Sequence, residues 1–287
     1  MSHKTKAVIL VLICVSLWAL IPVVAKLGQS DLDNHQFLFW SSLTSFIAML
    51  IFIFLNKKTQ HFKNYSIKDW LMAIALGFLG TYLYYILLYF GYANALGLEV
   101  LILQYSWPIL IVILSLIILK EKLNLYRITA IIVGFIGIIL VLTKGDLSKI
   151  YLDNYFIDLI ILFGALSFAL FSVLSKKIKL EEYSLITIYF LTATIFSFFS
   201  MIAISKFSWP STKSIIPILL NGILINGYSY IFWLKSLKNA QASFIAPFIF
   251  LTPVISAVYL VIFFNEKFLP IYAIGLFFVI IAGWLNK

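Results

Sequence analysis

The sequence contains little charge. Asp, Glu, Lys and Arg make up 11% of the 287 residues, whereas hydrophobic residues make up 63%. A soluble domain carries about 25% charged residues. With so few charges, a water-facing surface cannot be built around the whole chain, so most of the surface must face lipid. The scarcity of charge therefore excludes an ordinary soluble protein and predicts an integral membrane protein.

Cysteine and arginine occur once each. Cys14 is the only cysteine, so neither an intramolecular disulfide nor a metal cluster of thiolates can form. Arg127 is the only arginine, and the lysines are scattered among short loops. The net charge of +10 therefore forms no basic patch of the kind that binds nucleic acid. We expect a lipid bilayer and a small solute as partners, with no metal, cofactor or nucleic acid.

Signatures of catalysis are missing from the sequence. The three histidines, His3, His35 and His61, fall in the N-terminal tail or in predicted loops. No Gly-x-Ser-x-Gly, His-Glu-x-x-His or P-loop motif is present. An intramembrane enzyme needs a nucleophile with its base, or metal ligands, at membrane depth. We therefore predict no catalytic residue and no enzyme.

Long runs of apolar residues make up most of the sequence. A bilayer crossing takes about 20 residues, and lipid-exposed backbone must be helical. The runs predict an all-α integral membrane protein of ten transmembrane helices. With the N-terminus inside, 15 of the 21 Lys and Arg residues lie on inner segments, which predicts that both termini are cytoplasmic. The predicted helices span residues 7–26, 36–55, 70–90, 98–119, 125–142, 155–174, 185–205, 214–234, 242–264 and 270–286.

The two halves of the chain repeat each other at an offset of 145 residues. Five helices is an odd number, so the second repeat must enter the membrane inverted, as in many secondary transporters whose substrate site lies between the repeats. The predicted units are residues 1–145 and 146–287. The matches are Gly77 with Gly222, Tyr85 with Tyr230, Asn94-Ala95 with Asn239-Ala240, Pro108 with Pro253, and Glu121-Lys122 with Glu266-Lys267.

These residues resemble the drug/metabolite transporter superfamily, specifically its EamA-type ten-helix members. The features are Trp18-Ala19, Asn94-Ala95, Pro108, Glu121, and the glycines Gly134, Gly137, Gly275 and Gly283. Glu99-Val100 followed by Gln104-Tyr105-Ser106-Trp107-Pro108 is similar to the aromatic amino-acid exporter branch, in which Asn usually stands at the position of Gln104. The resemblance implies export of aromatic or other neutral amino acids. The inverted repeat suits alternating access, and the basic loops and short chain suit a bacterial cytoplasmic membrane.

Polar and aromatic residues within the apolar runs are the candidates for binding, because an amide in hydrocarbon must face a partner helix or a cavity. We expect a substrate site between helices one, three, four, six, eight and nine, with Pro253 beside it. Tyr84 and Trp233 are expected instead in the aromatic belt at the membrane interface. The predicted substrate-binding residues are Trp18, Tyr85, Gln104, Trp107, Asn226 and Tyr230.

Prolines and one carboxylate are further candidates. Pro108, Pro247 and Pro253 lie inside predicted helices, where proline removes a hydrogen bond. Each is either a packing kink or a hinge at the cavity. Glu99 opens the fourth helix near the outer face. It is either a carboxylate favoured by the helix dipole or a proton-coupling or amine-binding group.

A secondary transporter accounts for these patterns best. A channel would show rings of charge or a filter loop, and neither is found. A carrier of nucleotide-linked or phosphorylated solutes would favour Arg or Lys at depth, but the basic residues lie at segment ends or in loops. A carrier of choline or another amine stays open as an alternative, because aromatic cages bind quaternary ammonium groups. The oligomeric state is not predicted.

Overall fold

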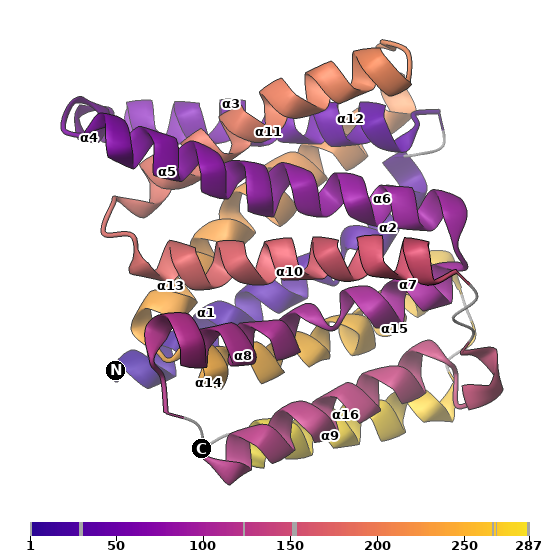
Figure 1. The fold of residues 1–287 in the computed structure, drawn as a ribbon. Helices are drawn as coiled ribbons and strands as arrows, with labels where there is room; N and C mark the ends of the chain where they lie inside the picture. The colour runs from indigo at the N-terminus through magenta and orange to yellow at the C-terminus, as the bar shows by residue number, and fades with distance from the viewer. Residues whose placement is uncertain are drawn as a thin grey trace.

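The computed structural model describes residues 2–28, 31–122, 124–150, 154–265, 267 and 269–285. The described residues form helices and connecting turns, with no strand among them. Nine helical segments in this part of the chain are long and apolar enough to cross a membrane, and the tenth, Pro270–Leu285, is shorter. The prediction of an all-α membrane protein with ten principal helices is confirmed (Figure 1).

The first half contains five spans, several of them built from more than one element. The short helix α4 (Gln60–Lys63) and the turn η2 (Leu147–Lys149) lie between spans. The spans are α1 (His3–Trp18) with α2 (Ile21–Gly28), α3 (Asn34–Leu55), α5 (Ile67–Gly77) with η1 (Phe78–Leu83) and α6 (Tyr84–Asn94), α7 (Gly97–Gln104) with α8 (Trp107–Leu119), and α9 (Leu125–Leu142).

The second half also contains five spans, but its first span is a single helix and its fourth includes a 3₁₀ segment. Its spans are α10 (Tyr155–Lys177), α11 (Glu182–Ile204), α12 (Thr212–Leu219) with η3 (Leu220–Tyr228) and α13 (Ser229–Asn239), α14 (Ala242–Ile245) with η4 (Ala246–Phe250) and α15 (Leu251–Phe264), and α16 (Pro270–Leu285). The third and eighth spans both contain a π-helical segment, η1 and η3. Such segments bond from residue i to i+5 and are frequent at functional sites.

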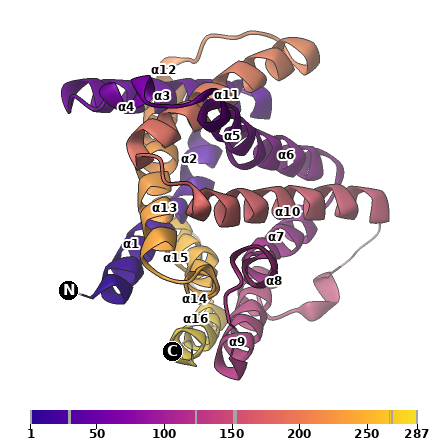
Figure 2. The ribbon, with the colours of Figure 1, turned by 60° about the vertical axis from the view of Figure 1, so that its left-hand side comes forward.

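The helices of the two halves exchange equivalent contacts. Helix α1 packs against α13 of the other half, as α10 packs against α6. Helix α3 packs against η3, as α11 packs against η1. Two further pairs, α3 with α11 and α9 with α16, join a helix to its own counterpart. Both views show α9 beside α16 at one edge of the bundle (Figures 1 and 2). A twofold relation between the halves requires this pattern.

Two repeat-related glycines permit the closest of these contacts. A Cβ added to Gly77 would lie 2.8 Å from the Cα of Tyr189 on α11. A Cβ added to Gly222 would lie 2.8 Å from the carbonyl oxygen of Ser41 on α3. Because real Cβ atoms do not approach backbone this closely, only glycine allows the helices to pack as they do.

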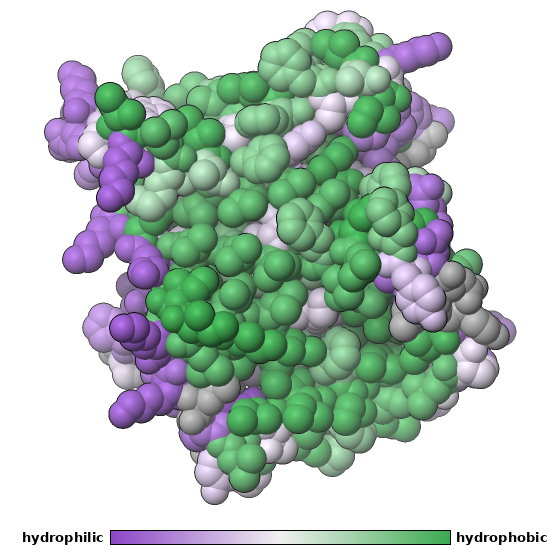
Figure 3. All heavy atoms as spheres, in the orientation of Figure 1, coloured by the Kyte–Doolittle hydropathy of each residue, from purple (hydrophilic) through white to green (hydrophobic). Residues whose placement is uncertain are grey.

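Hydrophobic residues cover the broad middle of the molecular face in Figure 3, and hydrophilic residues gather at its two ends. The first helix begins and the last helix ends on the same side of the bundle (Figure 1), which agrees with ten crossings. Two residues used in the sequence-based predictions, Glu266 and Lys287, lie outside the described residues.

Candidate functional site

A cavity of ≈ 540 Å³ lies between helices of both halves. Small-molecule sites typically enclose about 300–1,000 Å³, so the cavity has room for a metabolite. Seven spans contribute to its wall. The lining residues are Trp18, Ile21, Pro22, Ala25, Asn34, Phe37, Leu38, Tyr84, Tyr85, Leu88, Tyr89, Tyr92, Leu101, Gln104, Tyr105, Trp107, Phe168, Asn221, Asn226, Ile249, Thr252 and Ser256.

The cavity occupies one half of the bundle's thickness. The lining residues of the first span fall within 18–25, and those of the fourth span fall within 101–107. The N-terminal part of α1 and the part of α8 after Trp107 contribute none. The cavity therefore extends from the middle of these helices toward the side opposite the start of α1.

The wall combines aromatic rings with uncharged polar groups. Five tyrosines, two tryptophans, two phenylalanines and four amide side chains line it. Among the described lining residues there is no Asp, Glu, Lys, Arg or His. Binding here must therefore rely on ring faces, amides, hydroxyls and backbone groups.

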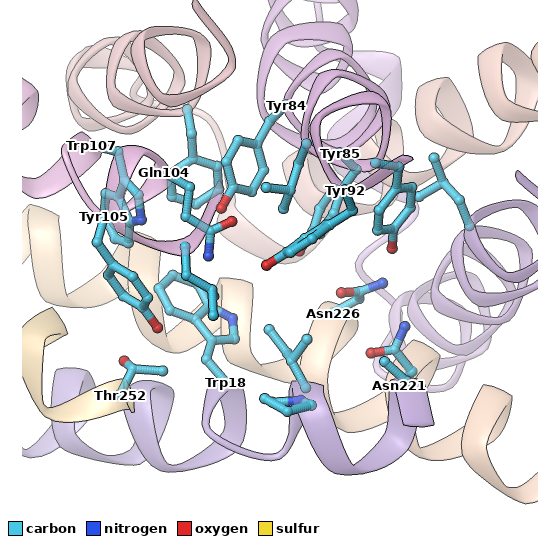
Figure 4. A pocket seen from close by; sticks show the side chains of 18 of the residues that line it. Trp18, Tyr84, Tyr85, Tyr92, Gln104, Tyr105, Trp107, Asn221, Asn226 and Thr252 are labelled. Carbon is cyan, nitrogen blue, oxygen red and sulfur yellow. The ribbon is translucent and has the colours of Figure 1, made fainter. Parts of the chain in front are cut away.

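Five of the six residues predicted from the sequence for substrate binding lie on this wall: Trp18, Tyr85, Gln104, Trp107 and Asn226. The close view shows them around one space, with Gln104 and Tyr105 toward one end and Asn226 toward the other (Figure 4). They come from spans one, three, four and eight, so the fold brings together residues that are distant in the sequence.

The sixth predicted residue, Tyr230, lies behind the wall. Its side chain is fully buried, and its hydroxyl donates to the Tyr85 hydroxyl over 3.4 Å and to the Gly80 carbonyl oxygen over 3.3 Å. Tyr230 therefore positions its repeat counterpart Tyr85 and is absent from the lining.

The floor of the cavity is an aromatic cluster. The ring of Trp18 makes edge-to-face contacts with Trp107 at 6.1 Å and with Phe168 at 6.0 Å between centroids. The rings of Trp107 and Phe168 are 4.9 Å apart. The Trp18 indole also donates to the Ser229 hydroxyl over 2.7 Å. These contacts fix the orientation of Trp18, because a buried indole N–H needs an acceptor.

The aromatic-belt prediction for Tyr84 and Trp233 is wrong. Tyr84 is buried and lines the cavity. Trp233 is fully buried, donates to the Ser172 hydroxyl over 3.1 Å, and packs against Trp18 at 5.5 Å. Both residues lie beside π-helical segments, and the extra residue per turn rotates the following side chains away from the positions that a regular helix would give them.

The three predicted hinge prolines lie at irregularities of the helices. Pro108 follows the turn at Tyr105 and Ser106 between α7 and α8. Pro247 lies inside the 3₁₀ segment η4, and Pro253 lies in the first turn of α15. None of the three is among the residues that line the cavity. Residues next to Pro108 and Pro253 do line it, since the repeat counterparts Trp107 and Thr252 both reach the wall.

The sequence-based prediction missed several lining residues. The first span breaks at Ala19 and Leu20, between α1 and α2, and Pro22 lines the cavity just beyond the break. A proline inside an apolar run was the available signal. Asn34 and Asn221 bring a second pair of amides to the wall. Asn34 belongs to the second span, which was not among the helices expected to form the site.

Glu99 is buried in the first turn of α7 and is not part of the cavity wall. Its position at the start of a helix fits the favourable interaction of a carboxylate with the helix dipole. A role of Glu99 in proton coupling therefore requires a proton path that does not run along the described wall of the cavity.

A polar cluster joins the helix ends on the other side of the floor. Glu121, just after α8, accepts hydrogen bonds from the Lys176 ammonium over 3.0 Å and from the Ala242 amide over 2.8 Å. Its second oxygen accepts from the Ser243 amide over 3.0 Å. Arg127 donates to Gln241 and to the Ser243 hydroxyl. The cluster therefore connects spans from both halves at the end of the molecule where α1 begins.

Hydrogen bonding keeps Glu121 ionised. Burial acts to raise its pKa, but the Ser243 and Ala242 amides and the Lys176 ammonium act in the opposite direction and hold the pKa below its ordinary value. Glu181 shows the same balance, since the Lys58 ammonium at 2.7 Å and the Ser184 amide lower its pKa against the effect of burial. Both carboxylates are therefore charged at neutral pH.

Comparison with known proteins identifies the family. The model of the EamA-like transporter family matches residues 5–143 and again residues 155–286. The chain belongs to the EamA-like transporter family. The two matches nearly fill the chain and fall on the two five-helix halves described above.

Several relatives are named as transporters. An uncharacterized transporter of Archaeoglobus fulgidus is 23% identical over 272 residues, covering 93% of this chain and 91% of the relative. The uncharacterized transporter YoaV of Bacillus subtilis is 26% identical, covering 84% of this chain and 82% of the relative. An S-adenosylmethionine uptake transporter of Rickettsia felis is 25% identical, covering 85% of this chain and 79% of the relative.

A solved crystal structure superposes on the described fold with a TM-score of 0.88, covering 99% of this chain and 98% of its own. The two sequences are 16% identical. This likeness shows the fold, and together with the family match it makes the chain a multi-pass membrane transporter.

Proposed function

We propose that the chain is a secondary transporter that moves a small organic solute by alternating access, with the described cavity as its substrate site. The observation that supports this proposal is that a cavity lies on one side of the aromatic floor, whereas the helix ends on the other side are joined to one another. Residues of both halves line the cavity, and the cluster around Glu121 and Lys176 joins both halves beyond its floor. Such a site between repeats is what alternating access needs.

The leading substrates are neutral or zwitterionic amino acids, aromatic ones first, exported across a bacterial cytoplasmic membrane. The wall supports this proposal because it offers ring faces for a flat apolar group and amides for polar ends, with no fixed charge among its described residues. The resemblance of the segment from Glu99 to Pro108 to aromatic amino-acid exporters points the same way. The division into units 1–145 and 146–287, with both termini inside, belongs to the same proposal.

A nucleoside-linked sulfonium solute is the second candidate. Relatives of this chain are named S-adenosylmethionine uptake transporters. A sulfonium is an organic cation, and aromatic rings attract such cations. The aromatic wall suits this candidate as well, and here the direction of transport would be inward.

The test is flux in proteoliposomes that contain the purified protein. Labelled aromatic and aliphatic amino acids, choline and S-adenosylmethionine are offered to vesicles with and without the same unlabelled solute inside. A transporter shows saturation and faster labelled uptake into preloaded vesicles, whereas a channel shows neither. Repeating the assay with a pH gradient tests proton coupling, and Glu99→Gln tests whether that carboxylate takes part. Absence of saturable flux for every solute contradicts the proposal.

A further inference from the structure

Three cavity residues are each followed, four positions later, by a proline. In an α-helix the carbonyl oxygen of residue i accepts a hydrogen bond from the N–H of residue i+4, and proline has no N–H. The carbonyl oxygens of all three residues therefore lack the i+4 donor for a covalent reason, but that of Ile249 accepts from the Leu251 N–H instead. The carbonyl oxygens of Trp18 and Gln104 are the two left without their helical donor. The pairs are Trp18 with Pro22, Gln104 with Pro108, and Ile249 with Pro253.

These carbonyl groups lie on the helix faces that form the wall. A helical carbonyl points along its helix toward residues i+3 and i+4. Trp18 and Pro22 both line the cavity. In the other two helices Trp107 follows Gln104 and Thr252 follows Ile249 by three positions, and all four line it. The stretch of chain between the members of each pair therefore lies beside the cavity.

The side chains around these carbonyl oxygens also contribute negative electrostatic potential. The rings of Trp18, Trp107 and Phe168 line the cavity at this level and pack edge to face on one another, and the face of an aromatic ring is negative. No Lys, Arg or His is found among the described lining residues. Carbonyl oxygens without their helical donor and negative ring faces both attract a cation.

The N-termini of two helices lie near these carbonyl oxygens, since α8 begins at Trp107 and α15 at Leu251. The free N–H groups of a helix N-terminus favour an anion, which is the alternative to a cation here. The prolines weaken this alternative. Pro108 is the second residue of α8 and Pro253 is the third of α15, so each removes one of the free N–H groups that an anion would use.

We propose that the floor of the cavity is a subsite for an organic ammonium group, and that the transporter selects its solutes by this positively charged nitrogen more than by a carboxylate. The subsite rests on the proposed function, since it assigns one end of the proposed substrate cavity. It would bind the ammonium group of an amino acid or of a simple amine through the carbonyl oxygens of Trp18 and Gln104 and the adjacent rings.

A matched ligand series tests the subsite on the purified full-length protein. Three skeletons, indolylethyl, phenylethyl and isopentyl, are each measured by calorimetry as the amine, the alcohol and the corresponding carboxylic acid. The amine should bind about tenfold or more tightly than the alcohol of the same skeleton, because hydrogen bonds to charged groups are the stronger ones. The acid should bind more weakly than the alcohol.

Proline variants separate the subsite from general effects on the helices. Pro22→Ala and Pro108→Ala restore the missing N–H, so the preference for amine over alcohol should fall toward one. Pro217→Ala is the matched control, because Pro217 lies inside α12 and the residue four positions before it, Lys213, is exposed and off the wall. This variant should keep the preference.

Tighter binding of the acids than of the amines overturns the subsite, whatever the variants do. An amine preference that persists in both Pro22→Ala and Pro108→Ala also overturns it. If no compound of the series binds but another solute is transported, the subsite is wrong and the proposed transport function stands. If no solute of any class is bound or transported, the proposed function fails as well.

Discussion

The carboxylate of Glu121 lies 3.0 Å from the ammonium of Lys176, and this contact joins the end of α8 to the end of α10. The two residues belong to different halves of the chain. The same carboxylate accepts the amides of Ala242 and Ser243 at the start of α14. In the proposed transport cycle, opening of the cavity toward the side where α1 begins has to separate these helix ends, so Glu121 is placed to hold that side closed.

Replacement of Glu121 by Gln should loosen the inner end. The amide keeps the side-chain volume but loses the ion pair and half of the acceptor capacity, a loss of about 1–3 kcal/mol. Hydrogen exchange of the amides in residues 240–245 should become about tenfold faster or more. Asp146→Asn is the control, because its pair with Lys149 is exposed at the opposite end. Equal exchange in wild type and Glu121→Gln would mean that this cluster does not hold the inner side.

The contribution of Glu121 should depend on pH in one direction only. Its pKa in the folded protein lies below the ordinary value of 4.5, so the carboxylate stabilises the fold above that value, and the contribution is lost as pH falls through the folded-state pKa. The difference in Tm between wild type and Glu121→Gln should stay constant from about pH 5 to 8. It should shrink only below pH 4.5. A difference that changes between about pH 6 and 8 would indicate another titrating group.

Much of the fold could be predicted from the sequence because its signals are local. A run of about 20 apolar residues has to form a helix in lipid, so the ten spans follow from composition along the chain. Proline removes a helical hydrogen bond at its own position in the sequence. Pro108 and Pro253 therefore indicated where the helices are irregular. The repeat in sequence indicated which positions would be equivalent, including Trp107 and Thr252 on the cavity wall.

Which side of each helix faces the cavity could not be predicted as well, because it depends on where the regular α-helical geometry is interrupted. The π-helical segments η1 and η3 change the rotation of every residue after them. Tyr84 therefore faces the cavity and Trp233 the core. The contribution of Asn34 depends on how α3 packs against the other half, and no short sequence pattern encodes that contact.

The repeat-related glycines should be intolerant of a methyl group. Gly77→Ala and Gly222→Ala each place a Cβ against the backbone of a neighbouring helix, and overpacking of this kind costs about 1–3 kcal/mol. Thermal unfolding of both variants should occur at lower temperature. Gly283→Ala is the matched control, since nothing described lies within 4 Å of its added Cβ. A Tm of Gly77→Ala and Gly222→Ala equal to that of the control would contradict the close packing of the halves.

The topology prediction is tested by reporter fusions. A fusion after residue 287 should be active only with a reporter that works in the cytoplasm, because ten crossings return the chain to the side of its N-terminus. A second fusion within residues 144–150, after the fifth span, should report the outer side. A C-terminal reporter found outside contradicts the arrangement of two inverted five-helix units.

The central claim is that the cavity around Gln104 is the substrate site, and counterflow through Gln104→Ala tests it most directly. Gln104 lines the cavity, and its side-chain oxygen has no hydrogen-bond partner within the described residues, so this oxygen is left for a solute to pair with. Gln104→Ala should leave folded, membrane-inserted protein and weaken transport by about 1–3 kcal/mol, a drop of roughly 5- to 150-fold. The control Asn94→Ala removes an amide that bonds to Phe90 of its own helix and is not on the wall, and it should transport normally. Normal transport by Gln104→Ala, with only a lower Tm, would show that Gln104 is a packing residue and that the substrate binds elsewhere.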